Sequence, residues 1–131
     1  MPGVQEHPTK RLVQFVDEVH AGDVIEYKHC RLPHVAVVAE KNTYIRANII
    51  ELKYVHVDEN GNVVEGLRTI DLENSYVYVQ IYDENETAEN AEVVRKAKER
   101  IGEKIVNRKL YKSSHFALSC KLKTTEDNNK D

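Results

Sequence analysis

Apolar and polar residues alternate through the middle of the chain, in five runs rich in β-branched and aromatic residues. Alternation with a period of two is typical of a strand with one buried face. The segment 58–62, between the third and fourth runs, contains Asn60 and Gly61, which accept the positive φ of tight hairpin turns. The pattern predicts an antiparallel β-meander of about five to six strands, with strands at 23–27, 34–40, 43–57, 63–72 and 75–82.

Helical spacing replaces this alternation on both sides of the meander. The stretch between Thr9, which can cap a helix, and Gly22, which can end one, predicts an N-terminal helix with an apolar face of Leu12, Val13, Val16 and Val19. Segment 84–104 is acidic at its start and basic at its end, as the helix dipole favours, and Gly102 stands where a helix would end. A second, shorter helix is expected from Ser113 or Ser114.

These elements predict an α+β fold in which the sheet packs with one N-terminal and two C-terminal helices. The length of 131 residues fits one domain, which we place at 1–122. Residues 123–131 are polar and lack periodicity, so they are expected to form a disordered tail.

Charge and composition narrow the classes of function. The chain has 19 Lys and Arg against 22 Asp and Glu, a formal charge of -3, so no global field attracts nucleic acid or acidic membranes. Apolar runs are shorter than the roughly 20 residues of a membrane helix, and the first residues lack the apolar core of a signal peptide. We therefore expect no transmembrane segment and a cytoplasmic location, with access to the nucleus by size. Cys30 and Cys120 are expected to be free thiols.

Three patterns, in this order, resemble the lecithin:retinol acyltransferase and phospholipase A/acyltransferase family, also called the H-box/NC family. GDVIEYKHCRLPHVAVVAE at 22–40 is similar to the opening strands of that domain, which carry a catalytic histidine. The helix at 91–111 is similar to the helix that leads to the nucleophile. SSHF at 113–116 stands where the family has Asn-Cys-Glu-His-Phe. The resemblance covers residues 22–122 and implies a permuted papain-like, or NlpC-like, arrangement.

The resemblance implies a catalytic set that this chain keeps only in part. His34 matches the catalytic histidine, Arg46 falls where a second histidine orients it, and Ser113 falls at the nucleophilic cysteine. Ser114 is the alternative by a shift of one residue. A thiolate is the effective nucleophile, and a permanent cation near His34 disfavours the imidazolium that a serine nucleophile would require. We therefore expect a pseudoenzyme.

The resemblance leaves two classes of function open. The first is a catalytically inactive domain that acts through protein, RNA or lipid contacts. The same domain resembles the non-structural 2A protein of several picornaviruses, so a viral role in replication is included in this expectation. The second is an active acyltransferase or phospholipase that uses His34 with Ser113, or with a cysteine placed differently in the alignment. Cys120 is expected to be a buried core residue.

A basic stretch at 94–112 is the other candidate site, for RNA phosphates or an anionic lipid surface. Its members are Arg95, Lys96, Lys98, Arg100, Lys104, Arg108, Lys109, Lys112 and the stacking residue Tyr111. The alternative is a solvated helix face held by Lys–Glu pairs.

The histidines show no spacing typical of a zinc site, and the glycines form no phosphate-binding cluster, so no metal and no cofactor are predicted. A long β-branched strand at 43–57 could leave a free edge, and a dimer is a further expectation.

Overall fold

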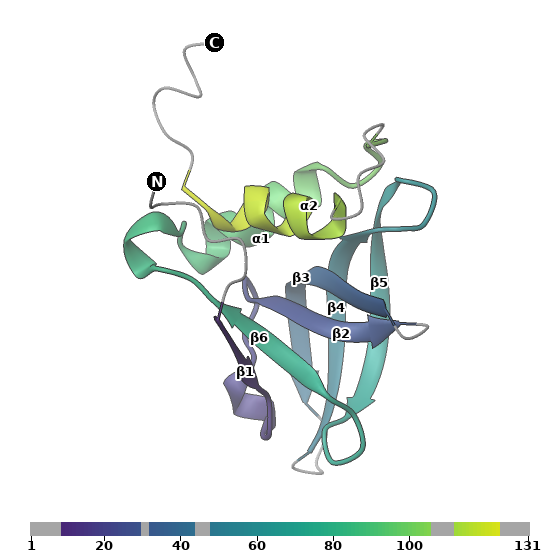
Figure 1. Cartoon of the computed structure of the whole chain (residues 1–131), viewed down its shortest axis with the longest axis vertical. Coiled ribbons are helices and arrows are strands. Elements are labelled where there is room, and N and C mark those ends of the chain that lie inside the picture. The colour runs from purple at the N-terminus through teal and green to yellow at the C-terminus, as the bar shows by residue number, and fades with distance from the viewer. Residues whose placement is uncertain (1–8, 30–31, 44–47, 106–111, 124–131) are drawn as a thin grey trace.

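The computed structural model describes residues 9–29, 32–43, 48–105 and 112–123. They form a six-stranded antiparallel sheet with two helices, so the predicted α+β class is confirmed (Figure 1). The strands are β1 (Thr9–Leu12), β2 (Val24–His29), β3 (Leu32–Thr43), β4 (Ile49–Val57), β5 (Val63–Asp71) and β6 (Val77–Ile81). The helices are α1 (Asn90–Glu99) and α2 (Lys112–Lys121), with short 3-10 turns η1 (Val16–Glu18) and η2 (Glu84–Glu86).

The strand order is β1-β6-β2-β3-β4-β5. Strands β2 to β5 form the predicted meander, and Gly61 turns the β4–β5 hairpin with a φ of 87°. Strand β6 departs from it, because β6 returns to pair with β2 rather than with β5. As a result β4 is paired on both sides, and the expectation of a free edge at 43–57 is wrong for the strand Ile49–Val57.

The predicted N-terminal helix is wrong. Residues Thr9–Leu12 form β1, which pairs antiparallel with Ile81–Tyr78 of β6, and Val13 N donates to Val77 O. Only a single 3-10 turn follows, at Val16–Glu18. The valines that suggested a helix are poor helix formers, and the open edge of β6 offers the backbone better hydrogen bonds than an isolated short helix.

Two apolar cores lie on the two faces of the sheet. The first contains Val79 of β6, next to one end of the strand order, and Ile70 of β5, at the other end, which shows that the sheet curls around it. The second lies between the other face and the helices, and includes Val37, Val93 and Phe116. Figure 1 shows α1 and α2 side by side over one end of the sheet.

Helix α1 is shorter than the predicted segment 84–104. Asp83 accepts a hydrogen bond from Asn85 N and starts the separate turn η2, so the acidic residues before Asn90 lie outside the helix. Gly102 has a φ of 97° but follows the C-cap of α1, which is Arg100, so the predicted helix end was two residues late. Of the predicted tail at 123–131, all but Lys123 lies outside the described residues.

None of the helices in the described ranges is long and apolar enough to cross a membrane.

Candidate functional site

His34 lies near the start of β3 and faces the first core. Its neighbour Val35 belongs to the second core, under the helices, together with Val37. Because successive side chains of a strand point to opposite faces, His34 shares its face with Ala36 and Val38 of the first core. The imidazole is therefore on the side of the sheet that the helices do not cover.

A second histidine holds His34 in place. His34 Nε2 and His56 Nδ1 are 2.7 Å apart, and the two rings meet edge to face with centroids 4.9 Å apart. His56 comes from β4, which lies beside β3. One of the two nitrogens, His34 Nε2 or His56 Nδ1, donates its N–H, and the other accepts with its lone pair. The hydrogen bond uses the Nε2 position of His34.

Two tyrosines and an arginine complete an imidazole–phenol cluster, defined as Tyr27, His34, Tyr54, His56 and Arg68. The Tyr27 ring meets the edge of His34 at 5.5 Å and that of Tyr54 at 6.0 Å. Burial, followed by the charge and hydrogen bond of Tyr54, raises the pKa of Tyr27 well above its ordinary value. The Arg68 guanidinium lies 4.8 Å above the Tyr27 ring, which places a fixed cation within this cluster.

The nucleophile position predicted by the resemblance belongs to another part of the molecule. Ser113 lies in the first turn of α2, and its side chain is outside the described residues. Further along α2, Phe116, Ala117 and Cys120 pack into the second core. Helix α2 and the His34 ring therefore lie on opposite faces of the sheet. Arg46 lies outside the described residues.

Cys120 is buried with 1 % of its surface exposed, as predicted for a core residue. Burial raises the pKa of its thiol, and the nearby Arg100 offsets this only in part. The thiol faces the second core, away from His34. Cys30 lies outside the described residues.

The basic residues of α1 and the following turn are largely engaged within the chain. Arg95 pairs with Glu92 and Glu99, and its pKa is raised by these two carboxylates. Arg100 pairs with Glu103 at 2.6 Å and lies over the Phe116 ring. These interactions agree with the alternative of a helix face stabilised by paired charges.

The remaining members of the basic stretch differ in their environment. Lys96 Nζ donates to Leu122 O at 2.7 Å, whereas Lys98 and Lys104 are exposed. Arg108, Lys109 and Tyr111 lie outside the described residues, as does the side chain of Lys112.

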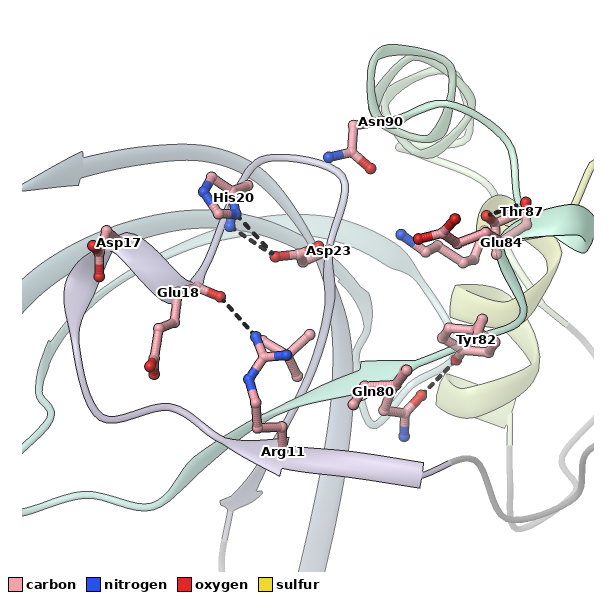
Figure 2. A pocket seen from close by; sticks show the side chains of 13 residues that line it. Arg11, Asp17, Glu18, His20, Asp23, Gln80, Tyr82, Glu84, Thr87 and Asn90 are labelled. Atoms are coloured by element: carbon pink, nitrogen blue, oxygen red, sulfur yellow. Dashed lines mark hydrogen bonds and ion pairs between the residues drawn. The ribbon is translucent and has the colours of Figure 1, made fainter.

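A cleft of about 450 Å³ has a described lining that includes none of the predicted site residues (Figure 2). It is formed where the N-terminal segment, the end of β6, the start of α1 and the end of α2 meet. Lys121 lines it, with 9 % of its surface exposed, and donates from Nζ to Gly22 O. Burial lowers the pKa of Lys121, and burial raises the pKa of Tyr82 to about 12. Four carboxylates line this cleft with two fixed cations, so acidic side chains outnumber basic ones there: Asp17, Glu18, Asp23 and Glu84 against Arg11 and Lys121.

Sequence reasoning missed the partners of His34. Tyr27 and His56 reach it through the registers of β2 with β3 and of β3 with β4, which no local motif encodes. The alternation in KYVHV was the available signal, because it places Tyr54 and His56 on one face. Within the described ranges, no three His, Cys, Asp or Glu residues gather as a metal site would require.

Comparison of the sequence with protein-family models and with curated proteins finds no match.

Proposed function

We propose that the chain is a non-catalytic domain of the lecithin:retinol acyltransferase-like type, which acts by binding rather than by acyl transfer. One observation carries the proposal. The His34 imidazole is hydrogen bonded to His56 on one face of the sheet, while α2, which begins at the nucleophile position, packs on the other. A general base must come within about 3 Å of the proton that it removes.

The chemistry at the two positions supports the same proposal. Ser113 is a hydroxyl where the family has a thiol, and a serine needs a base whose cationic form is stabilised. The described surroundings of His34 supply Arg68, a fixed cation, close to Tyr27, and this charge works against a second cation on the imidazole.

Among the possible ligands, the paired charges of α1 favour a protein over RNA or an anionic lipid surface. Phosphate groups would have to compete with these helix carboxylates for two arginines. Arg95 pairs with Glu92 and Glu99, and Arg100 pairs with Glu103. A viral non-structural role remains compatible with such a domain, as does a cellular one.

An esterase assay tests the proposal. The purified chain is incubated with phospholipid vesicles and with a short activated ester, and we expect no turnover above buffer. We expect the same for Ser113→Cys, because restoring sulfur leaves the base on the opposite face. Hydrolysis by either protein that is lost on His34→Ala and kept on His20→Ala, a change of an exposed histidine, would overturn the proposal.

A further inference from the structure

Strand β5 has an open edge along most of its length. It ends the strand order and pairs only with β4. At its start, Val63 N donates to Glu103 O and Val63 O accepts from Gly102 N, both at 2.9 Å. Val63 therefore turns its backbone groups away from β4. Beyond this residue, no other segment in the described part of the chain pairs with that edge.

The outward backbone groups of β5 follow from this contact. Hydrogen-bonding direction alternates along an antiparallel strand, so Glu65, Leu67 and Thr69 also point their N–H and C=O groups outward. The side chains of all three are exposed, and Leu67 has 61 % of its surface exposed.

This edge has few of the features that usually prevent strand addition. It contains no proline and no lysine, and its register with β4 continues without a bulge from Val63 to Asp71. Its backbone is therefore regular enough to accept another strand.

We infer that a second copy of this chain adds to β5 in antiparallel orientation, with a two-fold axis at Leu67, and joins two sheets into one. In this register Leu67 lies opposite Leu67 of the partner subunit, and Glu65 lies opposite Thr69 of the partner subunit. Arg68 lies opposite Gly66 of the partner subunit, which carries no charge. No like charges face each other, and the exposed leucines cover one another.

Neighbouring registers are less favourable. A two-fold axis at Arg68 would place two arginines opposite each other and Glu65 opposite Asp71 of the partner subunit. An axis at Gly66 would place Val63 opposite Thr69 of the partner subunit, inside the paired segment, although its backbone groups already bond to Gly102 and Glu103. With the axis at Leu67, Val63 falls opposite Asp71 of the partner subunit, at the last position of the strand, so the pairing can end before it. The inference goes beyond the proposed function and does not depend on it.

A charge-exchange experiment tests both the dimer and its register. Sedimentation velocity over a series of dilutions measures the dissociation constant of the dimer. Thr69→Glu places a carboxylate opposite Glu65 of the partner subunit on both sides of the axis, and we expect the dissociation constant to rise on the order of tenfold. The double variant Glu65→Lys with Thr69→Glu places opposite charges there instead, and we expect it to restore the dimer.

Thr9→Glu is the matched control, since Thr9 is exposed on β1, the other edge of the sheet. We expect it to leave the dissociation constant unchanged, and circular dichroism checks that every variant is folded. A wild-type chain that stays monomeric at all concentrations overturns the inference. So does a double variant that remains dissociated, or a Thr9→Glu variant that dissociates as Thr69→Glu does.

Discussion

At the scale of single residues, Gly66 decides how Tyr54 packs in the imidazole–phenol cluster. A Cβ atom at Gly66 would lie 2.8 Å from Tyr54 Cζ and 2.9 Å from its hydroxyl oxygen. Tyr54 is 8 % exposed and contacts both Tyr27 and His56, so its ring cannot swing aside freely. We predict that Gly66→Ala lowers the free energy of unfolding by about 1–3 kcal/mol, as overpacking does, when measured by urea denaturation.

Lys28→Ala is the control for this substitution, because Lys28 is an exposed strand residue. Its effect should stay within about 0.5 kcal/mol. Equal stability of the two variants would show that the Tyr54 ring can move without cost.

The thiol of Cys120 gives a second prediction at this scale. Because it is buried and its pKa is raised, it should react slowly with an aromatic disulfide reagent in the folded protein. A Cys30→Ser variant leaves Cys120 as the remaining thiol, and absorbance at neutral pH follows its reaction. We expect labelling to become rapid only in denaturant. Fast labelling without denaturant would reopen the hypothesis of a cysteine nucleophile.

The residues of the candidate site could be predicted only in part. His34 stood out because a motif of neighbouring residues surrounds it. The pairing with His56 depends on a register shift between Val38 and Glu40 of β3, opposite β4, and no sequence spacing reveals such a shift. The side of the sheet that His34 faces decides its chemistry, and that side follows from packing of the whole domain.

At the scale of elements, the turn of the β4–β5 hairpin is stabilised by one carboxylate. Asp58 Oδ1 accepts hydrogen bonds from Asn60 N and Asn62 N, both at 2.9 Å. The bond from Asn62 and then that from Asn60 lower the pKa of Asp58 below its ordinary value of 3.8, although burial partly opposes them. The folded state thus binds the proton more weakly than the unfolded state.

This stabilisation is present above the ordinary pKa and is lost as the pH falls through the lowered pKa. We predict that Asp58→Ala lowers the free energy of unfolding at pH 7, and that the difference from wild type narrows below pH 3.8. Urea denaturation at several pH values measures it. Asp58→Asn, which keeps an acceptor oxygen, should lose less stability, and its difference from wild type should narrow over the same pH range because it lacks the carboxyl too. A constant difference for Asp58→Ala would argue against the carboxylate as the cause.

Most strands were predictable because alternation and β-branched residues act locally. The predicted strand at 43–57 began too early, since Thr43 ends β3 and β4 starts at Ile49. The N-terminal segment could not be predicted, because its four apolar residues fit both a helix and a strand with a buried end. Its state is decided by Val77 and the rest of β6, which lie far along the chain and supply its hydrogen bonds.

At the scale of the whole molecule, the inferred dimer makes hydrogen exchange depend on concentration. The amides of Glu65, Leu67 and Thr69 point outward, whereas those of Val64, Gly66 and Arg68 point toward β4. We predict that raising the protein concentration slows exchange at the first three and leaves the second three unchanged. Residue-resolved exchange at two concentrations measures this. Exchange of both sets that ignores concentration would contradict the dimer.

The place of β6 in the strand order also has a consequence for synthesis. The β2–β3 hairpin leaves the ribosome before residues 77–81, so one side of β2 emerges with its backbone groups unpaired. Water or a chaperone must cover these groups until β6 is synthesised. The β1 segment also stays unpaired until then, because its partner is β6. A pause in translation between residues 57 and 77 would prolong this open state, and misfolding in the nascent chain should begin there.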